Sequence, residues 1–168
     1  MSLLIVFGGL PGVGKSALAR ELASRLGAVH VRIDSIEQGL RDSGLLIGPM
    51  NDAGYQAGYA VAEENLRLGR IVIADSVNPL KMTRDAWIAT ADRTQAQAVE
   101  VEVVCSDAAE HRRRVETRTT DISRLRLPTW PEVVAREYHS WERNHLIVDT
   151  AGRSLAECVK EIMEGLPI

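Results

Sequence analysis

The sequence predicts an α/β fold in which helices cover a parallel, doubly wound sheet of five strands. Short apolar runs alternate with segments of helical periodicity along the whole chain, as in successive strand–helix units. The first apolar run also leads through a glycine-rich loop directly into a helical pattern. No apolar run approaches the roughly 20 residues that a membrane span needs, so we expect no membrane association.

The order of the elements follows from periodicity and from helix-start and helix-end signals. Glycines at 27 and 69 are expected to end helices, and capping-box patterns open the helices after Thr129 and Ser154. The predicted strands are 3–7, 28–33, 71–74, 99–104 and 146–148. The predicted helices are 15–26, 35–41, 52–68, 79–92, 107–118, 129–144 and one that starts after 154, while 42–51 is expected to form a loop.

Composition favours one globular domain spanning residues 1–168, a length that allows a well-buried core. The two cysteines form no C-x-x-C pattern and the four histidines form no metal-type cluster. We therefore expect a cytoplasmic protein without a signal peptide or zinc site. The net charge of −3 disfavours general binding to polyanions. A monomer or a homodimer is compatible with the sequence.

The glycine-rich loop carries the most specific motif. Residues 9–16 fit the phosphate-binding pattern G-x-x-x-x-G-K-[ST] between a strand and a helix. Its backbone N–H groups and the start of the following helix would hold a phosphate. Lys15 would reach the β- and γ-phosphates, and the Ser16 hydroxyl would bind Mg²⁺. The nucleotide-binding residues are thus predicted to be Gly9, Leu10, Pro11, Gly12, Val13, Gly14, Lys15, Ser16 and Ala17.

Two acids follow predicted strands, at the sheet edge where doubly wound folds bind ligands. Asp34 follows the second strand and is predicted to accept a proton from a substrate hydroxyl, the alternative being a helix cap or an arginine partner. Asp75 follows four apolar residues, which is the Walker-B pattern of a Mg²⁺ ligand. The residues alone leave open whether Asp75 binds the metal or the substrate, and which of the two acids is the base.

Further candidate substrate contacts lie near these acids. Arg41 is placed to anchor an anionic or polar part of the acceptor, with a solvated helix residue as an equally good interpretation. Tyr55 and Tyr59 share a helix face beside the expected substrate loop. Asn78 comes three residues after Asp75 at the same strand end. We predict that these residues, together with Asp34 and Asp75, bind the phosphoryl acceptor.

Six arginines between 112 and 126 contrast with the acidic balance of the chain. They fall at a helix end and in the polar segment after it, which we interpret as a lid at about 112–128. Arginines in such a lid stabilise the charge that develops during phosphoryl transfer. Arg114 and Arg118, which share a helix face, are the predicted catalytic arginines, together with Lys15. A solvated basic surface is the alternative.

The chain resembles the small P-loop kinases that phosphorylate a hydroxyl. The resemblance rests on the loop at 9–16, the Asp34 site, the IVIADSVNP…TRDAW stretch at 71–87 and HRRRVETR at 111–118. This group includes bacterial "predicted kinases", polynucleotide 5′-hydroxyl kinase domains, chloramphenicol phosphotransferase, zeta toxin and gluconate kinase. It implies a three-layer P-loop NTPase fold with strand order 2-3-1-4-5 and assigns Asp34 as the base. It also maps an R-h-x-x-R lid pattern onto Arg114 and Arg118, and relates Asp75–Asn78 with Arg84 to the D-T-N…R segment of polynucleotide kinases.

These observations predict an ATP-dependent kinase that uses Mg²⁺ and transfers the γ-phosphoryl group to a hydroxyl of a small molecule. A nucleic-acid 5′-hydroxyl is a possible acceptor that the acidic surface disfavours. A GTP switch would need an N-K-x-D segment, which the sequence lacks. A mechanical AAA-type ATPase would need a second, helical domain, for which the chain is too short. A non-catalytic or regulatory ATP-binding module is the alternative function.

Overall fold

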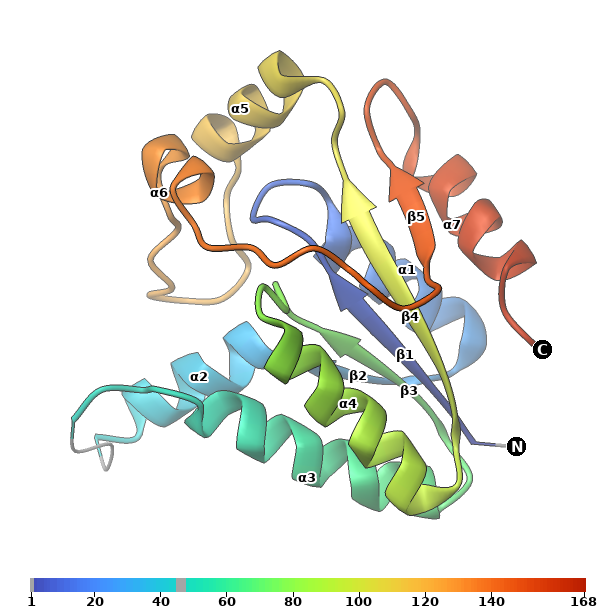
Figure 1. The fold of residues 1–168 in the computed structure, drawn as a ribbon. Coiled ribbons are helices and arrows are strands. Elements are labelled where there is room, and N and C mark those ends of the chain that lie inside the picture. Colours follow the sequence, from blue (N-terminus) through green and yellow to red (C-terminus); the bar gives the residue numbers. More distant parts are fainter. Residues whose placement is uncertain (1, 45–47) are drawn as a thin grey trace.

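Five parallel strands form one sheet in the order β2-β3-β1-β4-β5. The computed structural model describes residues 2–44 and 48–168. Figure 1 shows the first strand at the centre of the sheet. Both the parallel direction and the strand order match the prediction. The strands are β1 (Leu3–Gly8), β2 (Val29–Arg32), β3 (Ile71–Asp75), β4 (Gln97–Val104) and β5 (Leu146–Asp149).

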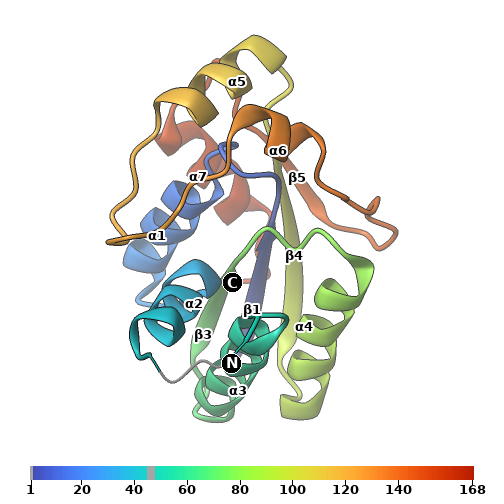
Figure 2. The ribbon, with the colours of Figure 1, turned by 90° about the vertical axis from the view of Figure 1, so that its left-hand side faces the viewer.

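Helices cover both faces of this sheet. Helices α1 and α7 pack on one face and α3 and α4 on the other, while α2 packs against α3 (Figure 1). The short helices α5 and α6 lie beyond the carboxyl ends of the strands (Figures 1 and 2). The bounds are α1 (Lys15–Leu26), α2 (Ile33–Asp42), α3 (Ala53–Arg67), α4 (Lys81–Thr94), α5 (Ala108–Thr117), α6 (Trp130–Val134) and α7 (Leu155–Glu164).

Strand β1 is buried on both faces, which explains its continuous apolar run. Its alternating side chains divide the core into two halves. Leu3, Ile5 and Phe7 pack with α1 and α7, whereas Leu4 and Val6 pack with α3 and α4. The central strand is therefore held by packing on both faces, and the loop that follows it starts from a buried position.

The predicted helix at 129–144 is wrong in its length. The capping box at Thr129 and Glu132 forms, but α6 ends at Val134. Residues beyond it make tertiary hydrogen bonds instead of helical ones: the His139 N–H donates to the Pro79 carbonyl at 2.7 Å, and the His139 ring accepts from the Lys81 N–H. The chain from 137 to 145 therefore runs extended or irregular along the sheet end.

The start of α2 also differs from the prediction. Strand β2 ends at Arg32 and the helix begins at Ile33, so Ser35 lies inside the helix rather than at its cap. Ile33 is buried against α3 and Trp87, a packing requirement that local capping signals do not report. As a result Asp34 lies in the first turn of α2, at the carboxyl end of the sheet.

No helix among the described residues is long and apolar enough to cross a membrane.

Candidate active site

The loop at residues 9–16, here called the phosphate loop, connects β1 to α1 at the carboxyl end of the sheet (Figure 1). Gly14 caps α1 with a left-handed φ of 98°, and Gly12 has a φ of 88°. A Cβ atom on Gly12 would also collide with the Val115 side chain. Only glycine suits these positions, and the tight loop presents its N–H groups and the helix start toward a ligand.

Lys15, the first residue of α1, is only 8% exposed. Burial lowers its pKa below the ordinary value, although the nearby carboxylates of Asp75 and Asp34 oppose this effect. The buried ammonium group is thus incompletely compensated by the protein alone. A polyphosphate bound in the loop would supply the missing negative charge.

Asp75 at the end of β3 is buried and surrounded by polar partners. The Ser16 hydroxyl donates to one carboxylate oxygen at 3.1 Å, and His30 lies 3.2 Å from the other. Arg32 approaches the same oxygen at 3.8 Å. Burial raises the pKa of Asp75, but the hydrogen bond from His30 and the charge of Lys15 outweigh it and hold the pKa below its ordinary value. Asp75 is therefore a carboxylate near neutral pH.

The pair of Ser16 and Asp75 fits a magnesium site. A hydroxyl and a carboxylate lie side by side at the phosphate loop, and Mg²⁺ prefers such oxygen ligands together with phosphate oxygens and water. The described residues contain no group of three or more histidine, cysteine or acidic side chains placed to hold a metal.

A cavity of about 680 Å³, the loop cavity, lies beside the phosphate loop. Arg118 lines it with its side chain half-buried, and burial lowers the pKa of its guanidinium while the charge of Asp34 opposes the shift. The Nε atom of Arg118 is buried without a hydrogen-bond partner among the described residues. The guanidinium is thus available to an anion in the cavity. The lining also includes Lys15, Ser16, Asp34, Arg114, Arg124 and Arg126.

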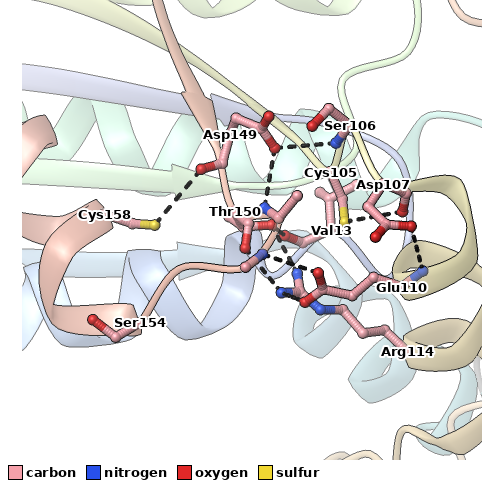
Figure 3. A network of polar contacts seen from close by, with 12 residues as sticks. Val13, Cys105, Ser106, Asp107, Glu110, Arg114, Asp149, Thr150, Ser154 and Cys158 are labelled. Atoms are coloured by element: carbon pink, nitrogen blue, oxygen red, sulfur yellow. Dashed lines mark hydrogen bonds and ion pairs between the residues drawn. The ribbon is translucent and has the colours of Figure 1, made fainter.

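Arg114 is tied to the phosphate loop through Thr150, as Figure 3 shows. It donates to the Thr150 hydroxyl at 2.7 Å and to the Thr150 carbonyl at 3.0 Å, and it forms an ion pair with Glu110. The Thr150 hydroxyl in turn donates to the Val13 carbonyl at 2.8 Å. Arg114 therefore fixes α5 against the loop. Arg112, by contrast, is 60% exposed and pairs with Glu116.

A second cavity of about 390 Å³, the acceptor cavity, adjoins the first. Its wall comes from α2, α3, α4 and the turn after β3. Asp34 and Arg136 line both cavities, together with Glu37 and Val77. Asp34 thus lies on the shared wall between the phosphate loop and a pocket of ligand size.

The tyrosines and the arginine predicted to contact the acceptor lie in two different cavities. Tyr55 and Tyr59 line the acceptor cavity, with their hydroxyls bonded to the Asn78 N–H (3.3 Å) and to the Thr83 carbonyl (3.2 Å). Arg41 lines the loop cavity instead and lies 3.4 Å from Glu37. Both tyrosines therefore lie on the side of the acceptor cavity, whereas Arg41 lies on the side of the loop cavity.

The expectation for Asn78 needs correction. Its side chain is fully buried, its amide nitrogen donates to the Phe7 carbonyl at 2.7 Å, and its amide oxygen accepts from Trp87 at 3.1 Å. Both polar groups are used inside the protein, so Asn78 fixes the turn after β3 rather than contacting the acceptor. Its left-handed φ of 48° fits such a turn.

Arg84 has a similar structural place. It is 2% exposed, donates to the carbonyls of Asn78, His139 and Ser140, and lies 4.7 Å from the centre of the Trp141 ring. It therefore holds the irregular segment after α6 against the sheet end.

Sequence reasoning missed Arg136. It follows α6 in a segment predicted as ordinary helix, far from the arginine cluster at 112–126, yet it lines both cavities. No local pattern marks it, because its position depends on where the chain leaves α6. The His30 and Arg32 contacts of Asp75 were also missed, since they join neighbouring strands that are distant in sequence.

Comparison with known protein families gives a match over residues 4–137 to the family described as "AAA domain". The chain belongs to this family. The match covers the phosphate loop, Asp34, Asp75, Arg114, Arg118 and Arg136.

Curated relatives share only part of the chain. An uncharacterized protein of Mycobacterium tuberculosis (strain H37Rv) and one of Mycobacterium bovis are each 37% identical over 75 residues. That segment is 42% of this chain and 15% of the length of those proteins.

Solved structures share the fold over nearly the whole chain. An APS kinase of Mycobacterium tuberculosis in complex with AMPPNP and APS has a TM-score of 0.71 at 20% identity, covering 97% of this chain and 96% of that one. A gluconokinase from Sinorhizobium meliloti has a TM-score of 0.67 at 21% identity, with 96% and 89% covered. Kti12 of Chaetomium thermophilum in complex with ADP-AlF3 has a TM-score of 0.68 at 21% identity, with 96% and 97% covered. The chain therefore has the fold of the P-loop kinases.

Proposed function

We propose that the protein is an ATP-dependent phosphotransferase that moves the γ-phosphoryl group of ATP to a hydroxyl of a small molecule. The observation that carries the proposal is the place of Asp34 on the wall shared by the loop cavity and the acceptor cavity. A base at this junction reaches an acceptor hydroxyl on one side and the transferred phosphoryl group on the other. An ATP-binding module alone has no need of the second cavity.

On the donor side, the phosphate loop holds the β- and γ-phosphates by its N–H groups and Lys15. Ser16 and Asp75 are the residues that would hold Mg²⁺, which neutralises charge on the phosphate oxygens. Arg118 and Arg136 lie on the lining where charge develops on the moving phosphoryl group. Arg114 braces the α5 side of the loop cavity through Thr150.

On the acceptor side, the Asp34 carboxylate accepts the proton of the acceptor hydroxyl. The hydroxyl oxygen forms a bond to the γ-phosphorus, and the bond from that phosphorus to the bridging oxygen of ADP breaks. The electron pair of the broken bond stays on ADP, so the products are a phosphate monoester, ADP and the proton on Asp34. Asp34 transfers this proton to solvent before the next turnover.

Proteins of similar structure support this proposal. Gluconokinase and APS kinase share the fold, and the structures solved with AMPPNP and with ADP-AlF3 hold nucleotide analogues. The proposal for this chain rests on its own two cavities and on the residues at their junction.

The test is Asp34→Asn, an exchange that keeps size while removing the base. Phosphoryl transfer to an acceptor should fall by about 100- to 10,000-fold, while ATP binding measured by calorimetry stays unchanged. Asp92→Asn on the exposed surface of α4 is the matched control and should transfer normally. Phosphoryl transfer by Asp34→Asn at the wild-type rate would contradict the assignment of Asp34 as the base. ATP binding without transfer to any acceptor of a broad panel by the wild-type protein would favour a regulatory module.

A further inference from the structure

We propose that the acceptor is an alcohol with an apolar or aromatic body and a protonated amino group. This inference rests on the proposed function, because it names the substrate class of the same site. It depends on three features of the acceptor cavity: its apolar wall, its excess of carboxylates and an unpartnered buried hydroxyl.

The wall of the acceptor cavity is largely apolar and aromatic. The rings of Tyr55 and Tyr59 lie 6.1 Å apart at a tilt of 49°, and the remaining apolar wall is formed by Ile33, Val77, Pro79, Leu80, Met82 and Ala86. A volume of about 390 Å³ suits a small organic molecule. Such a surface gains from burying a hydrocarbon or ring, and polar side chains such as Asn51, Gln56 and Thr83 complete the lining.

The charged side chains of this cavity are mostly acidic. Asp34, Glu37 and Asp52 line it, and Arg136 is the one cationic side chain on its described lining. Arg136 also borders the loop cavity, where its charge acts on Lys15 and on the phosphate site. Asp34 and Glu37 border the loop cavity as well, so Asp52 is the acid that lines the acceptor cavity alone. The part of the cavity at Asp52, away from the phosphates, is therefore negative, which favours a cationic ligand and repels a carboxylate or phosphate.

Glu37 is partly balanced by Arg41 at 3.4 Å, and burial raises its pKa above the ordinary value. No cation pairs with Asp52 in the part of the chain that the structure describes, and its side chain accepts a hydrogen bond from the amide of Gln56 at 2.9 Å. It lies just before α3 without capping that helix by a side-chain hydrogen bond. Asp52 is accordingly the carboxylate best placed to pair with an amino group at the outer end of the cavity.

A buried hydroxyl faces the same space. Ser76 is 5% exposed, and its hydroxyl has no hydrogen-bond partner of good geometry among the described residues. It lies close enough to the Tyr55 hydroxyl to moderate the burial-driven rise in the pKa of that tyrosine. An acceptor with a polar group beside its apolar body would give Ser76 a well-formed hydrogen bond, which the nearby Tyr55 hydroxyl does not provide in good geometry.

A matched series of ligands tests the proposal. Phenylalaninol, 3-phenyl-1,2-propanediol and phenyllactate share a ring and an aliphatic hydroxyl but carry an amine, a hydroxyl or a carboxylate. We expect phenylalaninol to bind the wild-type protein with ADP present at least about ten-fold more tightly than the diol, with phenyllactate weakest, by calorimetry. Equal or tighter binding of the diol or of phenyllactate, or no binding of phenylalaninol, would overturn the proposal.

Two exchanges locate the amine. Asp52→Asn should weaken phenylalaninol binding by about three- to ten-fold and leave the diol unaffected, and Asp52→Lys should weaken it further. Asp92→Asn, on α4 outside both cavity linings, is the control for a general charge effect. An equal loss for both ligands would mean that Asp52 acts on folding or packing, and would contradict its role in binding the amine.

The same series, extended by gluconate and the broad acceptor panel, is run with γ-labelled ATP to separate the two proposals. If phenylalaninol binds but no member receives phosphate, the proposed function fails while the ligand class stands. If gluconate is phosphorylated with a higher kcat/KM than every amine, the ligand class fails while the proposed function stands.

Discussion

The phosphate loop is one contiguous segment, whereas the acceptor cavity is assembled from side chains of α2, α3, α4, the turn after β3 and Arg136. The loop binds mainly through backbone N–H groups whose direction is set by glycines. The acceptor cavity is formed by side chains of separate elements. Tertiary hydrogen bonds, such as those that Asn78 and Arg84 donate, hold these elements in place.

This contrast explains what each region contributes. Backbone donors in a fixed loop suit a ligand part that never changes, the polyphosphate of a nucleotide. Side chains from separate elements form a surface that substitutions can reshape without disturbing the loop. Asp34 connects the two regions because α2 begins directly at the end of β2. Substitutions on the two sides should therefore give different kinds of loss.

The largest effect is expected at the phosphate loop. Lys15→Met should reduce phosphoryl transfer by roughly 1,000-fold or more, because the charge on the β- and γ-phosphates loses its buried partner. A coupled assay of ADP formation measures this transfer rate. Lys160→Met on α7, which is 75% exposed, should have full activity. Activity of Lys15→Met within ten-fold of the wild type would contradict the donor-site assignment.

On the acceptor side, Arg84 should matter most for stability. Arg84→Ala should lower the free energy of unfolding by about 3–5 kcal/mol, because it opens a cavity and leaves three backbone carbonyls without their donor. Urea denaturation followed by tryptophan fluorescence measures the change. Arg67→Ala, at a 53% exposed side chain, is the control and should cost about 0–1 kcal/mol. A loss below 1 kcal/mol for Arg84→Ala would contradict its structural role.

Arg136 tests whether the junction belongs to both cavities. Arg136→Ala should lower kcat/KM for the acceptor by about 10- to 100-fold through weaker charge stabilisation at the transferred phosphoryl group. Its affinity for ADP should change much less. Arg112→Ala removes an arginine whose partner is Glu116 and should be silent. Equal effects of the two exchanges would show that Arg136 acts only through the general charge of this surface.

The smallest effect concerns the capping box of α6. The pKa of Glu132 is lowered to about 2 by the hydrogen bond from Arg126 and those from Thr129. A carboxylate with a lowered folded-state pKa stabilises the fold above its unfolded pKa of about 4.3, and this contribution is lost as the pH falls toward 2. The stability difference between wild type and Glu132→Gln should therefore shrink between pH 5 and pH 2, measured by urea denaturation. A difference that stays constant over this range would contradict the assignment.

The sequence alone predicted the strands of the sheet and the phosphate loop. The apolar run at 3–7, the motif at 9–16 and the apolar run ending at Asp75 each encode their structure within a few residues, because a buried strand and a tight glycine loop are local requirements. Strand order came from the resemblance to the P-loop kinases, and the structure confirms it.

Tertiary structure decided the rest of the site. The helix expected at 129–144 stops at Val134 because Arg84 and Pro79 bind the backbone of the following segment, and this places Arg136 at the junction of the two cavities. Tertiary contacts also place the Asn78 side chain in the interior, because its amide forms hydrogen bonds with β1 and α4. The contacts Asn78–Phe7 and Arg84–His139 join residues that are 71 and 55 positions apart and leave no local pattern in the sequence. The sequence therefore predicted how a phosphate is held, and only the fold determined which surface faces it.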